Sequence, residues 1–215
     1  MKVSAEYRGI ARGNLKNNWG TAILVSLIVV AVSSLLSMIP AVGRVISLLF
    51  AGQFIVGELI YFTRLHRKQE ATLSSMFDGF GKNWINNFLT YLLQQVYIIL
   101  WALLFIIPGI IKMYSYSMTM YIKSQNPEMG HNEAITLSRK LMDGKKEGLF
   151  HLHLTFLGWA LLAVLTFGIG FIFLLPYMQA SNVAFYEDVY NEYNAKNNPV
   201  IESAEEEIEI QAEEE

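Results

Sequence analysis

One long stretch without a charge constrains the fold of this chain more than any other feature. Residues 21–39 read TAILVSLIVVAVSSLLSMI. A bilayer core of about 30 Å is crossed by about 20 apolar residues in an α-helix, so this stretch is long enough to span a membrane by itself. It is also longer than the apolar region of a secretory signal peptide, which covers about 7 to 15 residues. The sequence therefore predicts a membrane-spanning helix near the N-terminus.

Two later apolar blocks are each too long for a single crossing. As one helix, residues 88–122 would extend about 50 Å. Pro108-Gly109 lies inside this block and predicts a break, because proline lacks an amide donor and glycine loosens the turn. Residues 149–190 are also too long for one span, and Gly168-Ile-Gly170 predicts the second break. We expect Pro176 to kink the helix that follows.

The pattern as a whole predicts an all-α, polytopic membrane protein. Hydrophobic residues make up 53% of the chain and charged residues only 16%, whereas ordinary soluble domains carry about 25% charged residues. Residues 1–198 would form a single helical membrane domain with about six transmembrane helices, arranged as three hairpins. The predicted spans cover residues 21–39, 45–62, 88–107, 110–122, 149–167 and 171–190.

The last residues differ from the rest of the chain. From Pro199 onwards there are eight glutamates and no basic residue, which leaves 16 basic against 11 acidic residues in the remainder. Too few apolar residues lie in this segment to offset the entropy of ordering it. We therefore expect residues 199–215 to form a disordered acidic tail, with docking onto a partner as the alternative.

Basic residues predict the orientation of the membrane domain. Short cytoplasmic loops carry an excess of Lys and Arg, and the three proposed outer turns contain only Arg44. The distribution places both termini in the cytoplasm and the protein in the cell membrane. The predicted cytoplasmic basic residues are Lys2, Arg8, Arg12, Lys16, Arg64, Arg67, Lys68, Lys82, Lys123, Arg139, Lys140, Lys145 and Lys146.

Three polar segments have an amphipathic pattern that is typical of helices lying on a membrane surface. They cover residues 2–18, 72–80 and 132–142. The first combines an apolar face with several basic residues, and the third begins with Asn132 as a possible N-cap and ends at Asp143-Gly144. We expect each to seal the cytoplasmic side of a hairpin; a partner-binding surface is the alternative.

Polar residues in the fourth span are the first candidate site. Lys112 follows Pro108-Gly109 by about one turn, so we expect it near the outer interface, where its ammonium group reaches the headgroups. A functional cation in a cavity is the alternative. Tyr114, Ser117 and Tyr121 are spaced i, i+3, i+7 and would share one helix face that looks into the bundle or a wet groove.

Polar residues in the second and sixth spans complete the candidates. Glu58 is the only acidic residue within the apolar run of a span. Its expected role is a hydrogen bond or ion pair with a neighbouring helix, and proton or cation coupling is the alternative. Gln179 and Asn182, followed by Tyr186, repeat the i, i+3, i+7 spacing on the sixth span.

Catalytic patterns are scarce in this chain. It has no cysteine, which excludes disulfides and thiolate chemistry. None of the usual phosphate-loop, zinc-protease or serine-hydrolase motifs occurs. His151 and His153 are two residues apart, so on a helix they point to different faces and do not easily share a metal. We expect no enzymatic activity, no cofactor and no metal site.

The middle and later part of the sequence resembles a known family. The carrying motifs are IPGIIKMYSYSMTMYI, the AI-x-x-S-x-x-LM-x-G-x-K pattern from Ala134 to Lys146, TFGIGF, PYMQAS and FYEDVY. They are similar to an uncharacterised group of bacterial integral membrane proteins, domain of unknown function 975. The resemblance covers roughly residues 1–192 and implies fold and location, without catalytic residues. A distant resemblance to the membrane domain attached to some glycerophosphodiester phosphodiesterases accompanies it.

These observations favour a non-enzymatic protein of the bacterial cell envelope. We expect it to bind membrane lipids or a membrane protein partner, including another copy of itself, and not nucleic acid. The alternative is a small transporter or channel-like subunit with a polar path through the membrane. A membrane-embedded lipid enzyme is disfavoured, because no nucleophile and base share one face.

Overall fold

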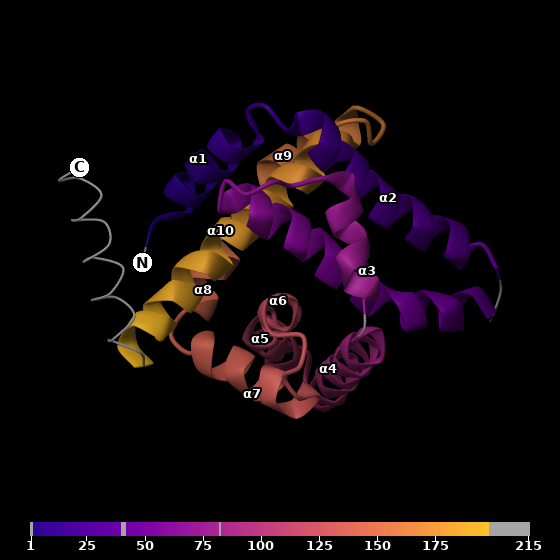
Figure 1. The fold of residues 1–215 in the computed structure, drawn as a ribbon, viewed down its shortest axis with the longest axis vertical. Coiled ribbons are helices and arrows are strands. Elements are labelled where there is room, and N and C mark those ends of the chain that lie inside the picture. Colours follow the sequence, from indigo (N-terminus) through magenta and orange to yellow (C-terminus); the bar gives the residue numbers. More distant parts are fainter. Residues whose placement is uncertain (1, 40–41, 82, 198–215) are drawn as a thin grey trace.

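The chain folds entirely into helices over the part that a computed structural model describes, residues 2–39, 42–81 and 83–197 (Figure 1). This confirms the predicted all-α class. The elements are α1 (Ser4–Leu15), α2 (Trp19–Ser37), α3 (Val42–His66), the 3-10 helix η1 (Leu73–Phe80), α4 (Trp84–Leu104), α5 (Ile106–Ser115), α6 (Thr119–Gln125), α7 (His131–Leu141), α8 (Lys146–Leu154), α9 (Leu157–Leu165) and α10 (Phe171–Asn197). The predicted acidic tail, residues 199–215, lies outside the described residues.

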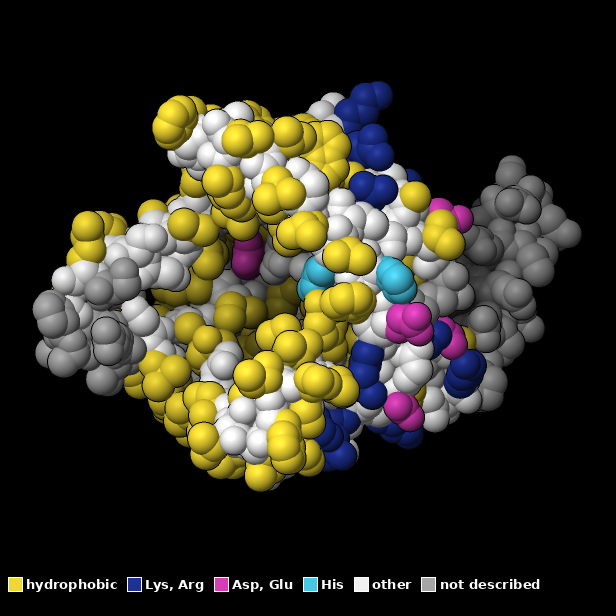
Figure 2. Space-filling view, turned by 180° about the vertical axis from the view of Figure 1, so that it is seen from behind, with side chains coloured by type: hydrophobic (Ala, Val, Ile, Leu, Met, Phe, Trp, Pro, Cys, Tyr) yellow, Lys and Arg dark blue, Asp and Glu magenta, His cyan; other side chains and the backbone are white. Residues whose placement is uncertain are grey.

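Three pairs of consecutive helices pack against each other, and two of these pairs, α4 with α5 and α9 with α10, end in exposed apolar tips. The pairs are α2 with α3, α4 with α5, and α9 with α10. Leu103 is 82% exposed at the tip of α4 and Phe167 is fully exposed between α9 and α10. Hydrophobic side chains cover the lobes on one side of the molecule, whereas the charged side chains gather on the other side (Figure 2). Exposed apolar surface of this extent is typical of a membrane contact.

Three helical segments are long and apolar enough to cross a membrane: Ile46–His66, Trp84–Leu104 and Lys146–Leu165. A fourth passes the same criterion only if α1 and α2 are counted together, and these two are bent by 106°. The chain is thus a candidate multi-pass membrane protein with three to four spans by length and composition. Six complete spans stay a prediction.

The break in the 88–122 block differs from the predicted one. The helix is interrupted at Phe105, which has an extended backbone, and not at Pro108-Gly109. Pro108 lies in the first turn of α5, where the amides have no helical partner and proline is tolerated. A Cβ at Gly109 would lie 2.7 Å from the Cα of Ala102. Pro108-Gly109 therefore begins α5 and packs it against α4.

The predicted helix over residues 110–122 is also wrong. A turn at residues 116–118 separates α5 from α6, and α5 has only ten residues, about 15 Å. The break predicted around Gly168-Ile-Gly170 is found between α9 and α10, where Phe167 and Gly168 have φ of 52° and 88°. Pro176 is accommodated inside α10, near its start.

The amphipathic segments take specific positions. Residues 2–18 correspond to α1, 72–80 to η1 and 132–142 to α7. Asn132 is not the N-cap of α7, because the helix begins one residue earlier and Gly130 takes the cap position. The chain turns after α7 at Gly144, whose φ is 71°, as expected of a residue that ends a helix.

Close backbone contact joins η1 to α3. A Cβ at Gly57 would lie 1.7 Å from the carbonyl oxygen of Met76, and one at Gly79 would lie 2.1 Å from that of Gln53. Arg64 adds hydrogen bonds of 2.7 Å to the hydroxyl of Ser75 and the carboxylate of Asp78. The buried core next to this contact includes Tyr61, Phe62, Met76, Met118, Tyr121, Ile122 and Phe185.

Gly57→Ala is expected to destabilise the protein, because the added methyl group meets backbone atoms that do not rotate away. We expect a loss of about 2 kcal/mol or more, the scale of overpacking in a closed core. Thermal unfolding of the purified protein in detergent measures the effect. Gly9→Ala in α1 is the matched control, since nothing lies within 4 Å of its added Cβ. Equal unfolding temperatures for the two variants would contradict the proposed contact.

Candidate functional site

Helix α1 is fixed to the C-terminal half of α10. The carboxylate of Asp188 accepts hydrogen bonds from Lys2 Nζ at 2.6 Å and from the Tyr7 hydroxyl at 2.7 Å. The Tyr7 ring also meets the ring of Phe185 edge-on, with centroids 5.4 Å apart. Tyr7, Ala11 and Leu15 form the buried face of α1. These contacts leave the adjacent, basic face of α1, which carries Arg8 and Arg12, next to the hairpin of α9 and α10.

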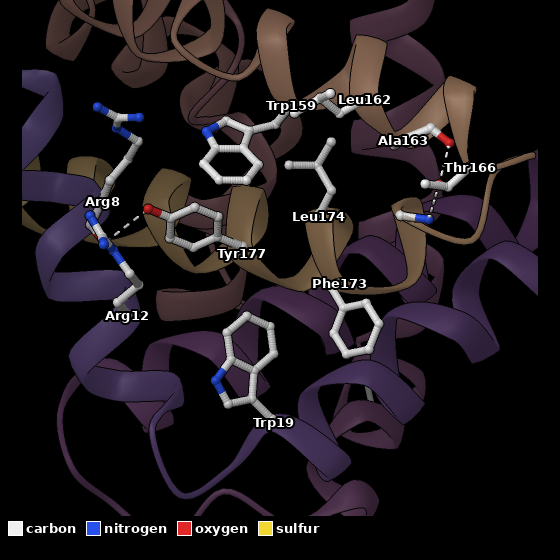
Figure 3. A pocket seen from close by; sticks show the side chains of 11 residues that line it. Arg8, Arg12, Trp19, Trp159, Leu162, Ala163, Thr166, Phe173, Leu174 and Tyr177 are labelled. Atoms are coloured by element: carbon white, nitrogen blue, oxygen red, sulfur yellow. Dashed lines mark hydrogen bonds between the residues drawn. The ribbon is translucent and has the colours of Figure 1, made fainter.

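A cavity of about 420 Å³ lies below that basic face (Figure 3). Arg8 and Arg12 of α1 form one end of it. Trp19, from the start of α2, and aromatic and aliphatic side chains of α9 and α10 form its walls. The remaining lining residues are Trp159, Leu162, Ala163, Thr166, Gly170, Phe173, Leu174 and Tyr177. We call this cavity the arginine pocket.

The local structure of α9 and α10 shapes the walls. Gly170 allows α10 to start close to α9, because a Cβ there would lie 2.7 Å from the Cα of Ala163. The Thr166 hydroxyl accepts a hydrogen bond from the Gly170 amide at 3.0 Å, which holds the turn (Figure 3). Trp159 is 54% exposed and Phe173 56% exposed. The apolar part of the arginine pocket is therefore open on its side.

The two arginines carry positive charge that no described acidic residue neutralises. Neither Arg8 nor Arg12 takes part in an ion pair among the residues that the structure describes. The Nε atom of Arg8 is buried without a hydrogen-bond partner there. The Tyr177 hydroxyl donates to the carbonyl oxygen of Arg8 at 3.3 Å and leaves the guanidinium group free. A buried donor without a partner is costly, so an anionic ligand would be favoured at this end.

Glu58 and Gln179 are brought together across the bundle. The carboxylate of Glu58 accepts a hydrogen bond from the Ser26 hydroxyl at 3.0 Å and one from Gln179 Nε2 at 3.4 Å. The three side chains come from α3, α2 and α10. In Figure 2 an acidic side chain lies inside a hollow that is walled by hydrophobic side chains. The contacts of Glu58 are those of the structural role expected for it.

Asn182 and Tyr114 are joined through a histidine. The two ring nitrogens of His153 lie 3.2 Å from the Tyr114 hydroxyl and 3.0 Å from Asn182 Oδ1. The spacing of His151 and His153 does not predict this role for His153. Its position within the apolar block 149–190 is the signal in the sequence, because a polar ring in such a block needs a hydrogen-bond partner. A transport path along Glu58, Gln179, Asn182 and the residues Tyr114, Ser117 and Tyr121 stays a prediction.

Ser117 and Tyr121 do not share a continuous helix with Tyr114, because Ser117 lies in the turn between α5 and α6. The Ser117 hydroxyl donates to the carbonyl oxygen of Tyr114 at 2.9 Å and so closes this turn. Tyr121 is fully buried, with its ring centroid 5.6 Å from that of Tyr186 on α10. Tyr114, Ser117 and Tyr121 therefore do not share one face of a single helix. Tyr121 nevertheless packs in the interior of the bundle.

Lys112 lies elsewhere, over the ring of Trp101 with 4.5 Å between Nζ and the ring centroid. It lines a cavity together with Arg139, Lys140 and Lys146. The sequence predicts that the thickness of a membrane separates Lys112 from these three residues. That prediction is wrong, because all four side chains line the same cavity.

Comparison with protein families identifies the chain. A family described as "Protein of unknown function (DUF975)" matches residues 1–115 and 103–193. The chain belongs to this family. No curated protein and no solved structure matches it, so the resemblance to the phosphodiesterase membrane domain gains no support. Within the described residues of this DUF975 protein, no three His, Asp or Glu side chains are placed to hold a metal ion.

Asp188→Asn is expected to loosen α1, because Lys2 loses its ion pair and Tyr7 loses a charged acceptor. Losing a hydrogen bond to a charged group costs about 1.5–3 kcal/mol. We therefore expect the amides of α1 to exchange hydrogen at least about tenfold faster, measured by mass spectrometry on the protein in detergent. Asp143→Asn is the control, since Asp143 is 85% exposed and pairs only with Lys146 in the described residues. Unchanged exchange in α1 would contradict the anchoring role of Asp188.

Proposed function

We propose that this DUF975 protein binds anionic membrane lipids in the arginine pocket and catalyses no reaction. The observation that carries the proposal is the pairing of two unneutralised guanidinium groups with an apolar, laterally open wall. An anionic lipid has the same division, with a charged headgroup at one end and hydrocarbon at the other. Arginine binds phosphate with two parallel hydrogen bonds, and the aromatic walls bury the acyl chain.

The orientation of the lipid follows from the elements that form the pocket. α1 carries the arginines on the charged side of the molecule, whereas Leu162 and Phe173 belong to the apolar hairpin of α9 and α10. The headgroup would lie against α1 and the chain along this hairpin. A lipid held in this way could also be shared with a membrane protein partner or with a second copy of the chain.

The Arg8→Gln and Arg12→Gln double variant tests the proposal. We expect native mass spectrometry of the wild-type protein to show bound phosphatidylglycerol in preference to phosphatidylcholine. The double variant should lose this preference by about tenfold or more, since each arginine supplies a charge-assisted hydrogen bond.

Lys16→Gln is the matched control, because it removes one positive charge from the exposed end of α1 without touching the arginine pocket. An equal loss in the control would assign the effect to general surface charge. Retention of phosphatidylglycerol by the double variant would overturn the proposal.

We further propose that the α2–α3, α4–α5 and α9–α10 pairs are three hairpins that enter the membrane tip first, with both termini in the cytoplasm. The apolar tips and the separate charged side support this arrangement. The chain has no cysteine, so single cysteines at Asn132 and Asn197 are clean probes. Both should react with a membrane-impermeant maleimide only after the cells are opened. Labelling of either position in intact cells would exclude the arrangement.

A further inference from the structure

A second cavity, formed by other elements than the arginine pocket, collects positive charge. It has a volume of about 500 Å³ and lies between α5, α7 and the start of α8. We call it the basic cavity. Its lining residues are Lys112, Ser115, Thr136, Arg139, Lys140, Asp143 and Lys146.

Four cations and one carboxylate share this space. Asp143 pairs with Lys146 at 3.6 Å, but its side chain is 85% exposed, so the pair is weak. Arg139 has no ion pair among the described residues. Like charges at close range repel each other. Arg139 and Lys140 are exposed, so solvent screens part of this repulsion, and an anion in the basic cavity would offset the net positive charge.

The lysines are held in place by aromatic rings. Lys112 Nζ lies 4.5 Å from the centroid of Trp101, and Lys140 Nζ lies 5.1 Å from the centroid of Tyr193. A ring face attracts an ammonium group without accepting hydrogen bonds from its N–H groups, whereas a carboxylate would accept them. Both lysines therefore keep N–H donors for a ligand. The Ser115 hydroxyl, by contrast, already donates to the carbonyl oxygen of Ile111.

The basic cavity borders apolar surface. Ile110, Ile111 and Met113, which flank Lys112 on α5, are each close to half exposed. A cation cluster beside exposed apolar side chains is placed where headgroups meet hydrocarbon. The ligand class must then carry concentrated negative charge and several acceptor oxygens, which describes a phosphate group better than a carboxylate.

We propose that the basic cavity binds a phosphate group, either the headgroup of a phosphomonoester lipid or free phosphate. Arg139 contacts it through its planar guanidinium group, and Lys112, Lys140 and Lys146 supply point charges. This site is independent of the arginine pocket, which is built from α1, α2, α9 and α10. Loss of lipid binding in the arginine pocket therefore does not imply loss of phosphate binding in the basic cavity.

Calorimetric titration of the full chain in neutral detergent tests the site with two probes, inorganic phosphate and short-chain phosphatidic acid. The titrations are run on the Arg8→Gln and Arg12→Gln background, so that the arginine pocket does not contribute. We expect binding of at least one probe, weakened about tenfold or more by Arg139→Gln and again by Lys146→Gln. Lys16→Gln should leave it unchanged.

The outcomes separate the two sources of phosphate. Binding of both probes with similar affinity assigns the site to the phosphate group alone, whereas binding of phosphatidic acid only assigns it to a lipid headgroup. In either case the ligand should change the tryptophan fluorescence, and Trp101→Phe should remove that change. Binding of neither probe, or equal binding by the Arg139→Gln variant, would overturn the proposal. A peptide of residues 199–215 is titrated as a third, acidic probe. Binding of this peptide in the basic cavity that phosphate fails to displace would also overturn the proposal.

Discussion

The pairing of polar side chains along α10 holds the described helices together. Polar side chains of α10 bond to three different helices: Asp188 to Tyr7 of α1, Gln179 to Glu58 of α3 and Asn182 to His153 of α8. Glu187, for example, is nearly buried and pairs with Arg67 at 3.0 Å. Beyond the membrane-facing part, hydrogen bonds from Lys145 and Lys196 lower the pKa of Glu192 to about 2, so this ion pair stays charged at neutral pH. Unpaired polar groups are costly away from water, so these pairs also fix the relative positions of the helices.

The sequence identified which residues need a partner, but not which partner they find. Glu58, Gln179 and Asn182 stand out because polar side chains are rare in apolar runs, and that signal is local. Their pairing with Ser26 and His153 depends on how distant helices pack, which no spacing within one helix encodes. The arginine pocket was missed for the same reason. Arg8 and Arg12 are unremarkable basic residues until α9 and α10 place aromatic side chains below them.

The clearest error came from treating proline as a helix break. Pro108-Gly109 predicts a reversal of the chain at that point, and this prediction puts Lys112 on the far side of the membrane. A proline in the first turn of a helix loses nothing, since those amides are unpaired in any case. The reversal lies at Phe105, a residue whose type gives no such signal. Lys112 then falls beside Arg139 and Lys146, and the charge arrangement of the basic cavity follows from this shift.

One packing device is shared by the α4–α5 and α9–α10 hairpins. In α4–α5, Gly109 packs against Ala102, and in α9–α10, Gly170 packs against Ala163; in both pairs the alanine lies seven positions earlier. A Cβ added to either glycine would lie 2.7 Å from the Cα of the alanine. Small residues let helices approach closely where lipid replaces water. Because this contact closes each hairpin, most of the cations next to it come from other elements. Arg8 and Arg12 of α1 line the arginine pocket beside α9 and α10, and Arg139, Lys140 and Lys146 of α7 and α8 line the basic cavity beside α5.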